Sequence, residues 1–432
     1  MNTHLTSLPI REQVRLVTSG DVTARELALD TRELIDSSEH DLRAWVSLVD
    51  PKDLNVRNSA PAPLQGLSIG VKDLIDVRGL PTLCGSTITH SAPAPDDAAC
   101  VQLFRSLGAV VQGKTVTTEF GYFSPGPTTN PYDAAHTPGG SSSGSAAAVG
   151  AGSIALALGT QTAGSLTRPA SYCGAAGMVL AHGSMNLTGI TGLSHSLDSL
   201  GLLTRTLEDM SYVYRAMEPM APAPALPSEA YFWWGSDLHP LDKTMIETLS
   251  YVKSFTDSRG LRSRDLNRDD HVRTLAEDHV TVMSYEAAQS RGSLLELPKG
   301  SISAPLTDIL RHGQAVSRRS YDAALTRSER TKTQIAELLN SSGIIVGPAA
   351  PGAAPSGLNA TGSPILSRPW QLLGLPVVVV PGANDTLGMP LGIQLIGLSG
   401  CESTLLAFGQ ELETFLRNQL PQPLTSPRSN HA

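Results

Sequence analysis

The sequence predicts an α/β protein built in layers, because short apolar segments alternate along the chain with segments of helical periodicity. Of its 432 residues, 41% are hydrophobic and 17% are charged, which supplies enough apolar material for a substantial core. We find no internal repeat of about 20 to 50 residues, and no clear linker interrupts the pattern. One large domain is therefore favoured over two.

The first predicted elements alternate between helix and strand. Residues 11–36 carry apolar positions at helical spacing, which predicts one or two surface helices. The apolar run 67–69 lies between two glycines and predicts a buried strand with Lys72 at or near its end. The segment "DDAACVQLFRSLG" then predicts a helix, and "AVVQGKT" after it predicts a strand.

The middle of the chain begins with the glycine- and serine-rich loop "HTPGGSSSG". The alanine-rich run that follows predicts a helix, and residues 154–158 predict a short strand. Pro169 suits the first position of another short helix, and residues 205–218 predict a longer one. Residues 219–300 are less decisive, because they are Pro-rich at first and then polar with scattered helical periodicity.

The last third of the chain predicts helix, three strands and helix. "LTDILRHGQAVSRRSYDAALTRSERTKTQIAELLN" is a long helical pattern in which Gly313 marks the expected break. "GIIVGP", "PVVVVPGA" and "LGIQLIG" predict three short strands. "ESTLLAFGQELETFLR" predicts a closing amphipathic helix.

Charge and cysteine content argue against several classes of protein. The net charge is −8 and no dense Lys/Arg cluster occurs, so a general nucleic-acid-binding surface is not expected. The four cysteines form no CxxC pair and no zinc-type cluster with histidine, which predicts reduced thiols and no metal site. The most apolar stretch, "LLGLPVVVVPGA", is about half as long as a membrane span, and "MNTHLTSLPIREQ" lacks the pattern of a signal peptide. We expect a soluble, cytoplasmic protein that binds neither membrane nor nucleic acid.

Residues 108–115, "GAVVQGKT", match the P-loop pattern GxxxxGK[ST]. That motif needs a strand before its glycines and a helix after its lysine. Here a predicted helix precedes the motif, and the following "VTTEFGYFSPGP" is a poor helix former. We therefore reject nucleotide binding at this segment.

The pentapeptide "GSSSG" matches GxSxG, the nucleophile elbow, with Ser142 at its centre. An elbow needs a buried strand directly before it and Asp/Glu and His partners later in the chain. The preceding "TTNPYDAAHTPG" has two prolines and no apolar run, and nothing singles out His182, His195 or His271 as the partner. A Gly/Ser turn that caps the alanine-rich helix explains the same residues.

Three segments taken together resemble the amidase signature family over almost the whole chain. They are "GLSIGVKDLIDVRGLPTLCGS" (66–86), "HTPGGSSSGSAAAVGAG" (136–152) and "LALGTQTAGSLTRPASYCG" (156–174). Their order, and the 24 residues from Ser141 to Ser165, match that family. Within it, "GGSSSGSAAAVGAG" with "ALGTQTAGS" is most similar to malonamidase-like members, whereas "GAAGMVLAHGSM" departs from the usual "GxKP" or "IKPS".

The resemblance implies the fold of that family, an α/β structure with a mixed central β-sheet covered by helices on both faces. It implies a single domain over residues 1–432. The catalytic core would comprise about 60–220 and 340–415, and a variable helical region would comprise about 219–340.

The resemblance also implies a Ser–Ser–Lys relay in place of a histidine base. Ser165 would be the nucleophile, Ser141 the bridge that passes protons, and Lys72 the terminal base. A lysine can accept a proton near neutral pH only if its pKa is depressed, and burial among apolar residues depresses it. Apolar residues flank Lys72 in the sequence. Without this context, a surface lysine at a strand end would be the simpler interpretation of Lys72.

The loop "TQTAGS" would supply the oxyanion hole of that relay. Its candidate donors are the backbone N–H groups of Thr162, Ala163, Gly164 and Ser165. Most family members have glycine where this chain has Ala163, and the alanine is acceptable if its φ is negative. Malonamidase-like members share Gln161, where more distant members often have aspartate. Ser142 becomes a hydrogen-bonding support, and Ser143 and Ser145 become residues of the helix start.

Arg168 lies three residues after Ser165. In malonamidase-like enzymes an arginine at this offset binds the carboxylate of the substrate, which a guanidinium can hold through two parallel hydrogen bonds. A structural arginine that pairs with a neighbouring carboxylate or carbonyl is the alternative. Because Pro169 follows, helical geometry is not expected at Arg168.

The resemblance therefore implies an amidase that hydrolyses the carbon–nitrogen bond of a small carboxamide through an acyl-enzyme. The substrate would be a small-molecule amide, with a carboxylate-bearing, malonamate-like amide as one option, and no cofactor or metal is implied. An ammonia-delivering component of the glutamyl-tRNA amidotransferase type, which works with a partner, is the first alternative. A non-catalytic binding descendant is the second, and the intact set of Lys72, Ser141 and Ser165 argues against it. A homodimer is left open.

Overall fold

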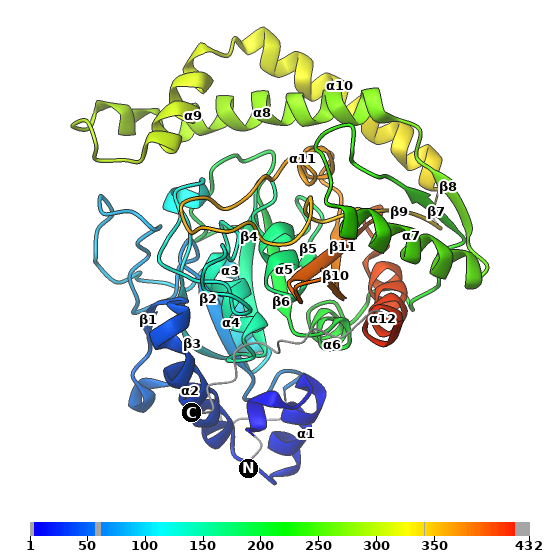
Figure 1. Ribbon diagram of the computed structural model, residues 1–432. Helices are drawn as coiled ribbons and strands as arrows, with labels where there is room; N and C mark the ends of the chain where they lie inside the picture. Colours follow the sequence, from blue (N-terminus) through cyan, green and yellow to red (C-terminus); the bar gives the residue numbers. More distant parts are fainter. Residues whose placement is uncertain (1–3, 57–61, 341, 420–432) are drawn as a thin grey trace.

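The computed structural model describes residues 4–56, 62–340 and 342–419 (Figure 1). Its strands are β1 (Trp45–Leu48), β2 (Ser68–Lys72), β3 (Val110–Thr115), β4 (Leu156–Gln161), β5 (Ala176–Val179), β6 (Ser199–Thr204), β7 (Glu229–Phe232), β8 (Arg262–Asp265), β9 (Gly343–Pro348), β10 (Val377–Asn384) and β11 (Pro390–Ile396). Within the described residues they form one eleven-stranded sheet in the order β1-β3-β2-β4-β6-β5-β10-β11-β9-β7-β8. The sheet is mixed, because β2 pairs in parallel with β3 and β4 whereas β6, β5, β10 and β11 are antiparallel neighbours.

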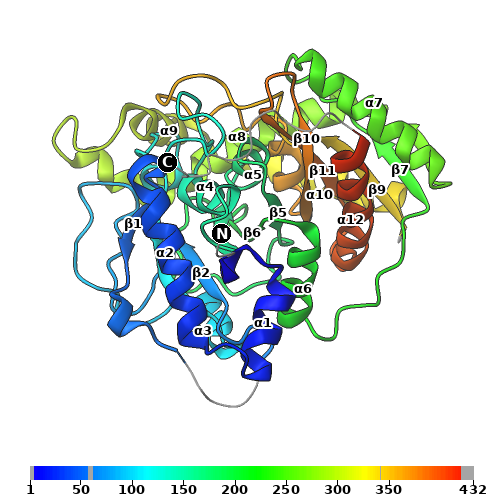
Figure 2. The ribbon, with the colours of Figure 1, turned by 60° about the horizontal axis from the view of Figure 1, so that its bottom comes forward.

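The helices are α1 (Ile10–Ser19), α2 (Ala24–Leu42), α3 (Ala99–Ser106), α4 (Ser143–Gly150), α5 (Thr167–Tyr172), α6 (Leu207–Met217), α7 (Lys243–Ser258), α8 (Asp269–Arg291), α9 (Ala304–Ala315), α10 (Arg318–Leu339), α11 (Arg368–Leu372) and α12 (Glu402–Gln419). Figure 1 shows α8, α9 and α10 as one layer at the top of the molecule, away from α1 and α2 at the bottom. Figure 2 shows α1 between α2 and α6, both of which it contacts.

Helices cover both faces of the sheet, and the alternation of side chains along each strand divides the core into two. In β10, Val378 and Val380 enter a core that also contains side chains of α1, α3, α6, α7 and α12. Val377 and Val379 point the other way, into a core shared with α2, α4, α5 and the α8–α11 group. The predicted α/β class with helices on both faces is therefore confirmed. Within the described residues, none of the helices combines the length and apolar character that a membrane crossing requires.

The parallel pairing of β2 with β4 brings two chain segments of the site together. β2 ends at Lys72 and β4 ends at Gln161, so both segments leave the same edge of the sheet. The serine-rich loop lies at this same edge of the sheet, and α4 begins at Ser143 immediately after the loop. The strand predicted at 154–158 is shifted in the structure and runs from Leu156 to Gln161, which carries it up to the loop at 162–165.

Two features of the less decisive segment 219–300 were missed from the sequence: the strands β7 and β8. β8 reads "RSRD" and lies at the sheet edge with mostly exposed side chains, so it lacks the apolar alternation that identifies a strand. The segment also contains the long helices α7 and α8.

The predicted break at Gly313 is wrong. α9 continues through Gly313 to Ala315, and α10 begins after Ser317, whose hydroxyl accepts a hydrogen bond from Ser320 N–H. Gly313 instead permits close packing against α8. A Cβ at this position would lie 1.8 Å from the carbonyl oxygen of Ser284.

We predict that Gly313→Ala lowers the free energy of unfolding by about 1–3 kcal/mol, because the added methyl group forces α9 away from α8. Urea unfolding measures the loss. Gly292→Ala is the matched control at the end of α8, since its Cβ would meet only Gln314 Nε2, at 3.8 Å. Equal losses in the two variants would contradict the packing explanation.

Candidate active site

Lys72 is a fully buried lysine without a carboxylate partner among the described residues. Its side chain is 0% exposed, and its Nζ lies 2.7 Å from Ser141 Oγ and 2.8 Å from Thr160 Oγ1. Burial lowers the pKa of Lys72 to about 7, against a smaller opposing effect of the Asp198 carboxylate. Near neutral pH a large fraction of this amine is therefore uncharged and able to accept a proton.

Lys114, the lysine of the rejected P-loop match, is equally buried but differently partnered. It lies in β3, and its Nζ forms an ion pair of 2.8 Å with Asp73 and a hydrogen bond of 3.0 Å to Thr82 Oγ1. Its segment is a buried strand, so no phosphate loop exists there. The carboxylate of Asp73, the residue after Lys72, pairs with Lys114. The partners of Lys72 are hydroxyl and carbonyl oxygens.

Ser141 and Ser165 both line one pocket with an empty volume of about 320 Å³. The Gly140–Ser141 peptide bond is cis. Ser142 N–H donates a hydrogen bond of 3.0 Å to the carbonyl oxygen of Ser165, which joins the serine-rich loop to the second loop. The structure brings Lys72 to Ser141 as predicted, but within its described residues it gives no hydrogen bond between the Ser141 and Ser165 hydroxyls.

The loop after β4 presents a run of free backbone donors. Among the described residues, no group accepts a hydrogen bond from the N–H of Thr162, Ala163, Gly164 or Ser165. Thr162, Ala163 and Ser165 line the pocket. Unsatisfied donors are costly where water is excluded, so their concentration at one pocket indicates a site for an anionic or strongly polar oxygen.

Side chains around this loop hold it in place. Gln161 folds back so that its Oε1 accepts hydrogen bonds of 3.0 Å from the N–H groups of Leu166 and Thr167. The Thr162 hydroxyl donates to the buried carboxylate of Asp198. On the other side, the Thr162 carbonyl oxygen lies 2.8 Å from Nε2 of His279.

Ser142 precedes α4, and its hydroxyl donates to the carbonyl oxygen of Thr160 at 3.3 Å. Ser143 and Ser145 lie within the first turn of α4. The Ser142 hydroxyl has no histidine partner among the described residues, so its surroundings are not those of a nucleophile elbow.

Arg168 is helical, contrary to the prediction drawn from Pro169. α5 begins at Thr167, so Pro169 is its third residue and not its first. A proline is tolerated in the first turn because those N–H groups have no partner inside the helix. Arg168 N–H still donates to the Gly164 carbonyl oxygen, at 3.3 Å.

The Arg168 guanidinium is buried at the pocket without an acidic partner among the described residues. One nitrogen, Nη2, donates to the Gly140 carbonyl oxygen and to Thr361 Oγ1, whereas Nε and Nη1 have no hydrogen-bond partner within the described part of the chain. The guanidinium lies 5.9 Å from the ring of Phe123. Burial lowers the pKa of Arg168 to about 10, so the group remains charged at neutral pH.

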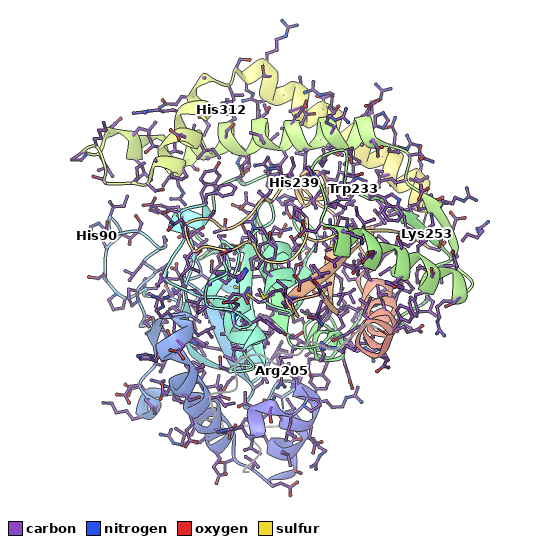
Figure 3. All side chains as sticks on the ribbon, viewed as in Figure 1. His90, Arg205, Trp233, His239, Lys253 and His312 are labelled. Atoms are coloured by element: carbon purple, nitrogen blue, oxygen red, sulfur yellow. The ribbon has the colours of Figure 1, made fainter. Side chains whose placement is uncertain are left out.

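The remaining wall of the pocket is mostly apolar or aromatic. It is formed by Gly121, Tyr122, Phe123, Gly140, Leu193, Met283, Thr361 and Pro364. Among the described residues no histidine lines it, and His90 and His312 lie on separate outer segments, a loop and α9 (Figure 3). The described side chains also contain no His/Cys/Asp/Glu group that could hold a metal ion.

Comparisons with known proteins find relatives over nearly the whole chain. Residues 41–232 match the Amidase family. The chain is 31% identical to a glutamyl-tRNA(Gln) amidotransferase subunit of Nitratidesulfovibrio vulgaris (strain DP4), over 94% of this chain and 95% of the relative. It is 30% identical to AmiA2 of Mycobacterium tuberculosis (strain ATCC 25618 / H37Rv), a putative amidase by name, over 95% and 92% of the two chains.

Solved structures extend the similarity to the whole fold. A crystal structure of an amidase superposes with a TM-score of 0.84 at 26% identity and covers 94% of this chain and 99% of its own. A glutamyl-tRNA(Gln) amidotransferase subunit from Thermotoga maritima superposes with a TM-score of 0.81 at 22% identity, over 99% and 100% of the chains. Fold and relatives thus define an enzyme that acts on carbon–nitrogen bonds. The chain belongs to the amidase signature family.

Sequence reasoning missed three residues that shape the site. Thr160 lay inside a quoted motif, five residues before Ser165, but nothing in the sequence distinguished its hydroxyl. Asp198 and His279 come from distant segments that only the folded chain brings to Thr162. His279 belongs to the less decisive segment and carries no motif.

The pKa of Lys72 makes a prediction about stability. Between pH about 7 and 10.5 the unfolded lysine holds a proton that the folded one has lost, so the free energy of unfolding rises with pH in this window. Lys72→Met has similar volume and no charge, and it removes this part of the slope. Urea unfolding at a series of pH values measures both proteins. Identical slopes would contradict a depressed pKa at Lys72.

Proposed function

We propose that this amidase hydrolyses a small carboxamide through a Ser–Ser–Lys relay, with Ser165 as nucleophile, Ser141 as bridge and Lys72 as base. One observation carries the proposal. A buried lysine whose pKa is lowered to about 7 holds its Nζ 2.7 Å from Ser141 Oγ, beside a run of free N–H groups, and both serines line the same pocket. Amide hydrolysis needs these parts together: a base, a hydroxyl nucleophile and donors for the oxygen that becomes negative.

The proposed proton movements use the Lys72–Ser141 hydrogen bond and the position of Ser165 on the wall of the same pocket. Ser165 Oγ attacks the carbonyl carbon and gives its proton to Ser141 Oγ, while Ser141 passes its own proton to the neutral Nζ of Lys72. The free N–H groups of the loop at 162–165 stabilise the oxyanion. Reversal of the relay then protonates the leaving amine, the C–N bond breaks and an acyl-enzyme remains. Water, activated by the same relay, releases the carboxylate and restores Ser165.

Arg168 supports a carboxylate-bearing, malonamate-like substrate. Its Nε and Nη1 are buried, have no partner among the described residues and belong to a side chain of the pocket wall, and a carboxylate could accept from both. The mostly apolar remainder of the wall suits the uncharged part of a small amide.

An ammonia-delivering component of a glutamyl-tRNA amidotransferase is the second candidate, because relatives named for that enzyme match nearly the whole chain at 28–31% identity. Such a component would use the same relay. Co-purification with a stoichiometric partner, together with slow ammonia release by the isolated chain, would favour it over a stand-alone amidase.

The organisation of the chain is part of the proposal. We assign the catalytic core to residues 60–220 and 340–415 and the variable helical region to about 219–340. We expect a cytoplasmic location and leave a homodimer open.

We predict that Ser165→Ala abolishes ammonia release from a panel of malonamate-like, ureide, aryl and fatty amides. Ser141→Ala and Lys72→Ala each lower kcat by several orders of magnitude, because members of a relay act as a unit. Ser143→Ala is the control two residues after Ser141, in the first turn of α4, since its hydroxyl donates to the Gly139 carbonyl oxygen. Unchanged turnover by Ser165→Ala would refute the assignment.

We predict that Arg168→Gln raises KM by about 10- to 100-fold for carboxylate-bearing amides, in line with the loss of a charge-assisted pair. Uncharged amides of the same length serve as the control substrates and should change little. Steady-state kinetics on matched pairs measures the difference. An equal effect on both kinds of amide would favour the structural interpretation of Arg168.

A further inference from the structure

One side chain of the helical layer, His279 of α8, reaches the loop that carries the free N–H groups. Its ring is 0% exposed, and Nε2 lies 2.8 Å from the carbonyl oxygen of Thr162. Since a carbonyl oxygen only accepts, Nε2 carries the proton in this bond. Burial, aided by the charge of Arg368, lowers the pKa of His279 to about 3, so the ring is neutral at the pH where Lys72 titrates.

The bond fixes the direction of a neighbouring donor. In a trans peptide the C=O and the next N–H point in opposite directions, and the Thr162–Ala163 bond is trans. A donor that holds the Thr162 oxygen on the α8 side therefore turns Ala163 N–H away from α8. Hydrogen bonding at the oxygen also polarises the peptide and strengthens its N–H as a donor.

His279 is the sole donor to this oxygen among the described residues. The other supports act elsewhere: Asp198 holds the Thr162 side chain, and Gln161 holds the N–H groups of Leu166 and Thr167. Neither sets the plane of the Thr162–Ala163 peptide. Without His279 this partly buried oxygen would lose its protein partner, and rotation of the peptide would be a route to another donor.

We propose that His279 is a positioning residue for amide hydrolysis, which orients the Thr162–Ala163 peptide so that Ala163 N–H stabilises the oxyanion. The inference rests on the proposed function of the loop as an oxyanion hole. His279 itself does not line the pocket, whereas Met283, one turn further along α8, does. The helical layer thus takes part in the reaction through the backbone and not through contact with the reacting atoms.

The test compares His279→Gln with His279→Asn on a substrate that the unmodified enzyme hydrolyses. The glutamine amide reaches the position of Nε2 and restores the bond, whereas the shorter asparagine amide does not. We expect kcat within about fivefold of the unmodified enzyme for His279→Gln and about 10- to 100-fold lower for His279→Asn, with KM within about twofold in both. Loss of kcat at constant KM is the sign of an interaction made in the transition state.

Val282→Ala on the same helix is the control for general loosening, since this side chain is 0% exposed and lies outside the pocket. It lowers the midpoint of urea unfolding but keeps kcat. A small alkyl boronic acid, which forms a tetrahedral adduct with a reactive serine, supplies a second readout: its affinity falls in His279→Asn, while that of the carboxylate product does not. Equal kcat in His279→Gln and His279→Asn would overturn the positioning role. Absence of amide hydrolysis by the unmodified enzyme would count against the proposed function itself.

Discussion

The site depends on one constraint: a lysine held in the core with no opposite charge among the described residues paired to its ammonium group. Burial of an ammonium group costs free energy. An ion pair of 2.8 Å with Asp73 offsets this cost for Lys114, whereas Lys72 has no such partner among the described residues. β2, which ends at Lys72, lies between β3 and β4 in the sheet, and Ser141 and Thr160 supply hydroxyl partners. The result is an amine whose pKa of about 7 lies near working pH, where a base is most useful.

A second energetically costly feature, a run of unpaired backbone donors, lies next to the buried lysine. The loop at 162–165 keeps its N–H groups unpaired within the described structure, although most buried backbone donors in proteins are satisfied. Side chains hold the loop from three directions: Gln161 accepts from the N–H groups of Leu166 and Thr167 just after it, Asp198 accepts from the Thr162 hydroxyl, and His279 of α8 donates to the Thr162 carbonyl oxygen. Preorganised donors of this kind need no rearrangement when charge develops on the substrate, which is the source of their catalytic value.

The parts of the fold and site that the sequence predicts are the local ones. The strand that ends at Lys72, the helix after the serine-rich loop and the three late strands depend on apolar runs and turn residues within a few positions. The roles of β8, Gly313 and His279 depend on neighbours that are distant in the chain. β8 is polar because it is an exposed edge strand. Position 313 requires glycine because α8 packs closely against it. His279 contacts Thr162 because α8 packs over the pocket. Arg168 is a third case. A following proline disfavours helical geometry, but Arg168 is helical because the first turn of a helix tolerates proline.

The candidate site is built from two parts of the molecule, the central sheet and helix α8. Lys72 ends β2, its Nζ lies 2.7 Å from Ser141 Oγ, and Ser165 lies in the loop after β4, so all three stand at the carboxyl ends of these parallel strands. Met283 adds to the pocket wall from α8, and the same helix anchors Thr162 through His279. A change in α8 would therefore alter the pocket wall at Met283 and the support of the Thr162 carbonyl oxygen together, while the Lys72–Ser141 pair stays in place. Because α9 approaches α8 closely at Gly313, the placement of α8 depends in turn on a residue far from the chemistry. The helical layer is thus mechanically coupled to the candidate site, and substitutions in α8 can change the pocket wall and the support of Thr162 without altering Lys72, Ser141 or Ser165.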